Sequence, residues 1–215
     1  MITRSEHMGS KHQHAGRSAA AVAMLYALDM LHAGGMLHAG AINQSQSAEP
    51  MLAAAVDDIP REYQIKAALL YNFTKLVEWP SDSFAAATDP IVIAVLGDSP
   101  CFPALDLALK GRTVNSRPIV VRRGESVQEA ASAQVLFVSA SHEDRFAAMA
   151  AMLGSAPVLT VGESAAFAAM RGGAINFIVH QDKVGFEIHL NAAVHARLKI
   201  STHLLQLAMD VRWIG

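Results

Sequence analysis

Four continuous apolar runs constrain the fold of this chain more than any other feature of its sequence. Because none of them alternates with polar residues, each run predicts a strand that is buried on both faces. Strands of that kind belong to parallel sheets that helices cover on both sides. The runs are IVIAVL, VLFV, VLTV and AINFIV, at residues 91–96, 135–138, 158–161 and 174–179.

Helix-length segments alternate with these strands. The first, residues 61–79, places its apolar residues three and four positions apart, which predicts an amphipathic helix that ends before Pro80. A weaker strand signal covers residues 119–121, and further helices are expected at residues 103–110, 126–131, 143–153 and 164–170. This alternation predicts right-handed crossovers, and therefore a three-layer α/β domain with a mostly parallel sheet flanked by helices.

The last part of the chain follows a different pattern. After a turn at residues 181–183, residues 184–190 alternate between apolar and polar, with Glu187 and His189 on the polar face. This alternation predicts a C-terminal hairpin whose second strand is antiparallel, lies at the edge of the sheet and is half exposed.

Polar residues are expected to cap the last two helices. Asn191 can cap a short helix, and Ser201 or Thr202 can cap a final helix over residues 203–212. Asn176 lies inside the fourth strand, where we expect a paired polar group of the core rather than a catalytic residue.

The first 60 residues carry the pattern of a secretory signal. Basic residues precede the apolar run AAAVAMLYAL, and the later AGA has the small-x-small form of a signal-peptidase site. Charged and histidine side chains interrupt any window there that is long enough to span a membrane. We therefore expect a signal peptide, a linker and a single α/β domain, over residues 1–41, 42–60 and 61–215.

Charge and missing motifs argue against several classes of function. Lys and Arg number 17 against 19 Asp and Glu, and a net charge of -2 argues against nucleic-acid binding. The sequence contains no GxSxG, GxGxxG, GxxxxGK, HExxH or CxxC motif. We therefore expect a protein that is not an enzyme and that holds no cofactor or metal.

Three residues are candidate ligand contacts because they follow strands of the expected parallel sheet. Asp98 and Ser99 come after the first strand, and His142 comes after the run VLFV. Ligands collect in crevices beyond the carboxyl ends of such strands. The same residues also fit ordinary strand-to-helix turns, and the sequence leaves both interpretations open.

Arg112 and Arg117 are further candidates for ligand binding. They begin a group of four arginines, completed by Arg122 and Arg123, around the weaker strand signal. Guanidinium groups bind phosphate well, but alternate residues of a strand share a face, so a clamp would require the fold to gather them. A solvated edge strand is the other interpretation.

A mixed-charge surface is expected near the end of the chain, and it is a candidate partner contact. It would consist of Glu187 and His189 on the outer face of the last strand, with Arg197, Lys199 and His203 following in sequence. Such a surface suits a protein partner, a small ligand or only solvent.

Six segments, taken together, resemble the YfiR-like proteins in order and spacing. They are EYQIKAALLYNFTKLVEWP, IAVLGDSP, GRTVNSRPIVVRR, VLFVSASHEDR, PVLTVGESAAFAAMRGGAINFIV and FEIHLNAAVHARLKISTHLLQLA, within residues 61–212. The resemblance implies a non-catalytic periplasmic α/β protein that binds and represses an inner-membrane diguanylate cyclase. Such a repressor controls cyclic-di-GMP output and biofilm or exopolysaccharide formation, and an outer-membrane lipoprotein can sequester it.

The chain departs from the YfiR-like pattern at its cysteines. Better-known YfiR proteins carry paired cysteines that link their control to redox state, whereas Cys101 is the single cysteine of this sequence. Redox control through an internal disulfide is therefore not expected, while a disulfide between two chains of a homodimer stays open. We expect Cys101 to be a small buried or half-buried residue.

A second function, of a different class, is also compatible with the sequence. In this alternative the protein is a secreted sensor whose crevice near Asp98 and His142 binds a nucleotide or another anion.

Overall fold

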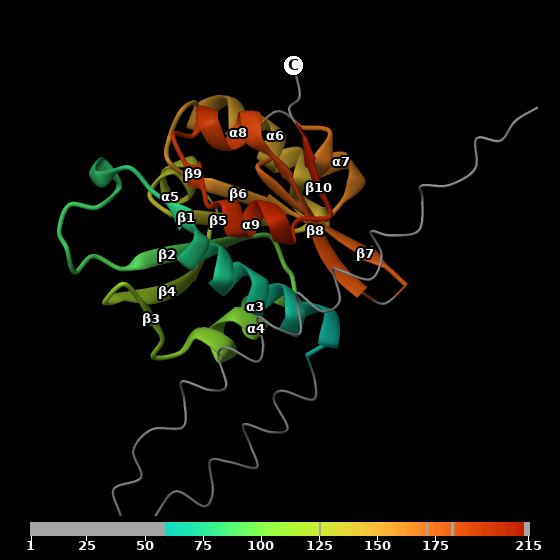
Figure 1. The fold of residues 1–215 in the computed structure, drawn as a ribbon, viewed down its shortest axis with the longest axis horizontal. Helices are drawn as coiled ribbons and strands as arrows, with labels where there is room; N and C mark the ends of the chain where they lie inside the picture. The colour runs from blue at the N-terminus through green and yellow to red at the C-terminus, as the bar shows by residue number, and fades with distance from the viewer. Residues whose placement is uncertain (1–58, 125, 171, 182, 213–215) are drawn as a thin grey trace, which may run out of the picture. The chain divides into compact units, whose positions relative to one another are not determined.

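The computed structural model describes residues 59–124, 126–170, 172–181 and 183–212, which are drawn in colour in Figure 1. The expected signal peptide, residues 1–41, lies outside the described residues. The same holds for all of the expected linker except its last two residues. None of the helices in the described ranges is long and apolar enough to cross a bilayer.

The elements follow the order that the apolar runs predict, with additions at both ends of the domain. In chain order they are α3 (Arg61–Leu76), β1 (Val77–Glu78), η1 (Ser81–Ser83), β2 (Ile91–Leu96), α4 (Cys101–Leu109), β3 (Thr113–Val114), β4 (Arg117–Arg123), α5 (Val127–Ala131), β5 (Val135–Val138), η2 (Ala140–His142), α6 (Glu143–Leu153), β6 (Leu159–Gly162), α7 (Ala165–Ala168), β7 (Ile175–His180), β8 (Lys183–His189), α8 (Leu190–His195), β9 (Lys199–Ile200), α9 (Thr202–Leu207) and β10 (Asp210–Arg212).

Eight of the described strands form one sheet, in the order β10-β8-β7-β6-β5-β2-β4-β3. The five inner strands from β4 to β7 run parallel to one another, while β8 is antiparallel to β7 and β3 is antiparallel to β4. The predicted fold class, a mostly parallel sheet with an antiparallel hairpin near the C-terminus, is confirmed. Strands β1 and β9 pair separately as a small antiparallel ladder.

Helices cover both faces of the sheet, as the buried strands require. On one face Phe73 of α3 stacks on Phe177 at 5.9 Å between ring centroids and meets Phe186 edge-on at 5.0 Å. On the other face Phe146 of α6 and Phe167 of α7 pack with the inner residues of β2 and β5. Figure 1 shows α6, α7 and α8 on the side of the sheet opposite to α3 and α4. The three-layer arrangement is therefore confirmed.

The predicted half-exposed edge strand is wrong. The antiparallel pairing of β8 with β7 is as expected, but β10 lies along the outer side of β8 in a parallel register. As a result Glu187 and His189 are only 4% and 3% exposed. Their alternation with apolar residues reflects two different buried faces, rather than one buried and one solvated face.

Two expectations about the last helices are also wrong in part. The final helix ends at Leu207 instead of continuing to residue 212, because residues 210–212 pair with β8 as β10. Asn191 does not cap α8, since that helix begins at Leu190 with His189 as its N-cap. The expectation for Ser201 is confirmed, because its side chain accepts a hydrogen bond from the Leu204 N–H at 3.2 Å.

Candidate functional site

The chain changes direction at the carboxyl ends of β2 and β5. After β2 it continues into α4, on the face covered by α3, whereas after β5 it continues into α6 on the opposite face. Neighbouring strands whose connections leave toward opposite faces open a crevice between them, and this switch point is where open α/β sheets bind ligands.

A polar cavity of about 130 Å³ lies at this switch point. The ends of β2 and β4, the η2 turn that follows β5 and the first turn of α6 contribute its walls. The lining residues are Val95, Gly97, Asp98, Arg123, Gly124, His142 and Arg145. We call this the switch-point cavity.

Gly97 determines how closely its neighbours approach one another in this cavity. Its φ of +90° is a conformation that side chains rarely adopt, and an added Cβ would lie 2.3 Å from His142 Nδ1. The imidazole is held in place, because His142 Nδ1 and Ser141 Oγ are 2.9 Å apart and Ser141 Oγ is 2.9 Å from Ser139 Oγ. A glycine after β2 is therefore required for the histidine to line the cavity.

Two charged groups meet at the mouth of the cavity. Arg123 Nη1 donates to Asp98 Oδ1 at 2.8 Å, and the Arg123 guanidinium lies over the Phe102 ring at 4.7 Å. The Asp98 side chain is 95% exposed, so water screens this ion pair and it contributes little to stability. The aromatic contact holds the guanidinium at the site whether or not the carboxylate stays bound to it.

A buried lysine of α3 contacts the carboxyl edge of the sheet at the ends of β5 and β6. Lys66 Nζ forms ion pairs with Glu62 and, at 2.7 Å, with Glu163 after β6. Burial disfavours the ammonium, but hydrogen bonds to the two carboxylates outweigh that effect and raise the pKa of Lys66. Glu163 Oε1 also accepts from the Ala140 N–H at 3.2 Å. This Lys66 cluster therefore fixes α3 against the ends of β5 and β6.

Tyr63 belongs to the same neighbourhood. The Lys66 ammonium lies 4.6 Å from the centre of the Tyr63 ring. Burial, together with the negative charge of Glu163, raises the pKa of the Tyr63 hydroxyl. The phenol therefore stays neutral and polar at physiological pH.

Cys101 is inert in this setting. The side chain is completely buried and has no disulfide partner, as expected from the sequence. Burial and the nearby Glu163 carboxylate raise the pKa of the Cys101 thiol, which suppresses the reactive thiolate. The position at the start of α4 does not overcome this burial.

The predicted ligand residues divide into two groups. Asp98 and His142 line the switch-point cavity together. Ser99 lies beside it and accepts a hydrogen bond from the Cys101 N–H at 3.1 Å. Arg112 and Arg117 are elsewhere: Arg112 lies 5.4 Å from the Tyr71 ring, and Arg117 donates to the carbonyls of Ala86 and Asp89. The fold does not gather the four arginines into one clamp.

Sequence reasoning missed Arg145 as a member of the cavity. It lies in the first turn of α6, three residues after His142, on the helix that follows β5. That spacing is a usable signal, because a residue in the first turn after a parallel strand lies near the carboxyl edge of the sheet. From the sequence, Arg123 is identifiable only as one of the four neighbouring arginines.

The predicted partner residues are also divided by the fold. Glu187 and His189 are buried, where Glu187 accepts from Asn176 Nδ2 at 3.2 Å and pairs with Arg212 at 3.0 Å. Asn176 is therefore a core residue, as expected, but it is paired only through Nδ2, since its buried Oδ1 has no hydrogen-bond partner among the described residues. Arg197, Lys199 and His203 are exposed. Arg197 pairs with Asp82 at 2.9 Å, and Lys199 lies 3.7 Å from Glu78.

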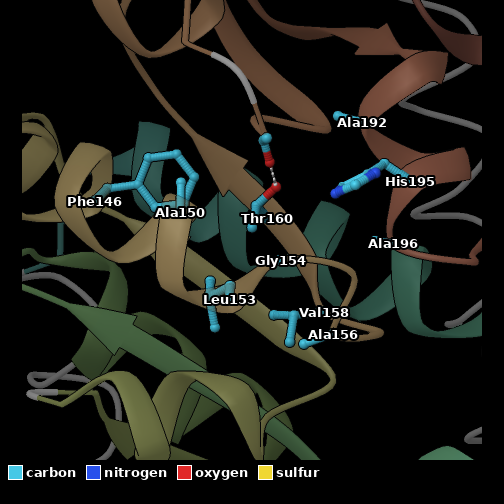
Figure 2. Close-up of a pocket in the computed structure, with 11 residues that line it drawn as sticks. Phe146, Ala150, Leu153, Gly154, Ala156, Val158, Thr160, Ala192, His195 and Ala196 are labelled. Atoms are coloured by element: carbon cyan, nitrogen blue, oxygen red, sulfur yellow. Dashed lines mark hydrogen bonds between the residues drawn. The ribbon is translucent and has the colours of Figure 1, made fainter.

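A second, mostly apolar cavity of about 30 Å³ lies between α6, β6 and α8. Figure 2 shows the His195 ring pointing from α8 toward Thr160, whose hydroxyl donates to the Gly172 carbonyl. None of the residues selected from the sequence lines this groove. Across the described ranges of the chain, no three His, Cys, Asp or Glu side chains are grouped so that they could hold a metal ion.

Comparison with known proteins places these features in one family. A family model described as YfiR/HmsC-like matches residues 63–209. The matched segment extends from the first turn of α3 to just before β10 and includes every residue that lines the switch-point cavity. No curated protein matches the sequence at a significant level.

Proposed function

Because the chain belongs to the YfiR/HmsC-like family, we propose that it binds the periplasmic portion of an inner-membrane diguanylate cyclase and represses that enzyme. In coarser terms, family membership supports a periplasmic regulator of cyclic-di-GMP signalling and a non-enzymatic role. The observation that carries the proposal is the extent of the match, which covers more than half of the chain and nearly all of the described domain.

Repression of this kind requires no chemistry from the protein. The repressor must bind the inactive conformation of the cyclase more tightly than the active one, by about 1 to 3 kcal/mol. An outer-membrane lipoprotein that competes for the same surface would then release the cyclase. Cyclic-di-GMP, and with it biofilm and exopolysaccharide formation, would rise.

The exposed residues of α8, β9 and α9 form our proposed contact surface. We define this α8–α9 surface by Val194, Arg197, Lys199 and His203. Val194 is 59% exposed, so its side chain can supply apolar area at the centre of an interface. Arg197 and Lys199 suit its charged rim, because their ion pairs with Asp82 and Glu78 are exposed and can exchange partners.

The function is tested by measuring cyclic-di-GMP in cells that lack the gene. We expect the deletion to raise cyclic-di-GMP several-fold, and the full chain to restore the lower level. A version that begins at residue 42 and is retained in the cytoplasm should not restore it. An unchanged cyclic-di-GMP level after deletion would refute the proposal.

Charge reversal tests the contact surface separately. Arg197→Glu and Lys199→Glu should each weaken repression, while Lys183→Glu, a change at the exposed first residue of β8, should not. Circular dichroism and protein level in the cell check that each variant is folded and exported. If both reversals repress normally, the α8–α9 surface is not the contact, although repression through another surface would remain supported.

A further inference from the structure

The switch-point cavity contains the groups that recognise an oxyanion. Arg123 arrives from the end of β4 and Arg145 from the first turn of α6, so two arginine residues from different elements line one small space. Asp98 is the single carboxylate among the lining residues. Glu143 and Asp144, which share the first turn of α6 with Arg145, do not line the cavity. With two arginines and one aspartate, the lining residues carry an excess of positive charge.

Guanidinium groups favour phosphate in particular. Their planar N–H pairs match two oxygens of a phosphate at once, and their charge persists at every physiological pH. Two such groups from different elements can contact the oxygens of a tetrahedral anion from different directions. A carboxylate ligand is planar and has only two oxygens, so it would fill such a site less completely. His142 adds a ring nitrogen at the same wall.

The size of the cavity limits what can enter it. Pockets for whole drug-sized ligands occupy roughly 300 to 1,000 Å³, whereas this cavity measures about 130 Å³. It has room for one compact group, with any larger part of the ligand left outside. Gly97 is part of this fit, because a Cβ there would lie 2.5 Å from Ser139 Oγ as well as against His142.

Asp98 has the position of an internal substitute for the ligand. Its carboxylate oxygen lies 2.8 Å from Arg123 Nη1, at hydrogen-bond distance from the group that an anion would contact. The side chain is almost completely exposed and can turn into solvent without losing buried contacts. An incoming anion can therefore replace it at Arg123 while Phe102 keeps the guanidinium in place.

We propose that the switch-point cavity binds a phosphate group, as inorganic phosphate or as the terminal phosphate of a larger ligand, through Arg123 and Arg145, with displacement of the Asp98 carboxylate. This proposal goes beyond repression of a cyclase and does not depend on it. Binding is measured on the protein alone, so failure of one proposal leaves the other unaffected.

The test is a titration of the ¹⁵N-labelled full chain, followed by the amide resonances of Gly97 and Gly124. The probes are sodium phosphate and adenosine 5′-monophosphate, each against sodium chloride at the same ionic strength. Saturable shifts with phosphate but not with chloride are expected. Tighter binding of the nucleotide would identify a phosphate ester as the ligand, and equal binding would identify phosphate itself. Shifts that are identical in phosphate and chloride would overturn the proposal.

Substitutions give the proposal a directional signature. Arg145→Gln and Arg123→Gln should each weaken phosphate binding at least tenfold, whereas Asp98→Asn should strengthen it several-fold by removing the competing carboxylate. Arg112→Gln is the matched control, since it removes the same charge beside Tyr71 and away from the cavity, and should stay within twofold of the natural protein. If Asp98→Asn weakens binding, or if the control weakens it as much as Arg145→Gln, the cavity is not the site.

Discussion

Replacing Lys66 by methionine should destabilise the domain far more than any other lysine substitution on α3. The Lys66 side chain is 3% exposed, and that of its partner Glu163 is 6% exposed. Glu62, the other partner, is 38% exposed and can be solvated by water when the ammonium is removed. The variant therefore leaves one buried carboxylate, Glu163, whose hydrogen bond from the Ala140 N–H at 3.2 Å remains.

Removing one partner of a buried ion pair costs about 3 to 5 kcal/mol. For a domain of this size, that loss corresponds to a decrease in Tm of roughly 6 to 20 °C. Glu163→Gln alone should cost less, about 1.5 to 3 kcal/mol, because Lys66 keeps its bond to Glu62. The double variant Lys66→Met/Glu163→Gln should recover most of the loss, since no buried charge is left.

Urea denaturation followed by circular dichroism measures these free energies of unfolding. Lys75→Met is the matched control, because Lys75 is an exposed lysine of the same helix that lies over the Tyr71 ring. It should cost less than about 1 kcal/mol. The reasoning fails if Lys66→Met is as mild as Lys75→Met, or if the double variant is no more stable than Lys66→Met.

Three further predictions follow from the same edge of the sheet and from its pKa shifts. Stability should fall as the pH rises above about 10, because Tyr63 and Lys66 keep their protons in the folded chain to a higher pH than their ordinary pKa values of 10.0 and 10.5 allow in the unfolded chain. A Lys66→Met protein that shows an equally steep alkaline loss in urea titrations would contradict the assignment to Lys66. Gly97→Ala should destabilise the fold by about 1 to 3 kcal/mol, which is more than Gly111→Ala should cost. Both glycines have positive φ, but of the two only Gly97 has neighbours within 4 Å of an added Cβ. Equal decreases in Tm for the two variants would show that the contact with His142 can relax. Cys101 should resist a thiol reagent such as DTNB at pH 8 in the folded protein and react promptly in urea, and rapid labelling without denaturant would disprove its burial.

The sheet was predictable because its strands carry their own signal. Residues 91–96 and 135–138 are strands with the predicted bounds, since a run of branched apolar residues without polar alternation fits only a strand covered on both faces. The helix at Glu143–Leu153 was predictable from its length and its position between two strands. In these segments local pattern and final burial agree.

The C-terminal region was harder because its fate depends on partners distant in sequence. Residues 203–212 fit a helical stripe, yet the Met209 N–H bonds to the Phe186 carbonyl at 2.8 Å and the chain continues as β10. That strand and Asn176 of β7 supply the partners that allow Glu187 to be buried. Alternation along one strand cannot reveal such partners. The sequence alone therefore predicts a solvated face for Glu187 and His189.

The position of the candidate site was predictable from the sequence, but the full set of residues that line it was not. Asp98 and His142 follow from the rule for the carboxyl ends of parallel strands. Which arginines join them depends on strand order: Arg123 ends β4 beside β2, whereas Arg117 begins the same strand at its other end. Arg123 and Arg117 are six residues apart on the same strand. Arg123 lines the cavity, whereas Arg117 hydrogen-bonds to the loop that contains Ala86 and Asp89.

The contacts of α3 tie the earliest part of the domain to the latest. Phe73 packs against Phe186, and Val77 at the end of the helix is registered with Ile200. The surface of α3 is covered only when Phe186 and Ile200 are present. A growing chain therefore lacks its finished core until almost the whole domain has been synthesised. Such long-range closure slows folding. The folding rate of the domain should therefore depend on how soon its last strands and helices reach α3.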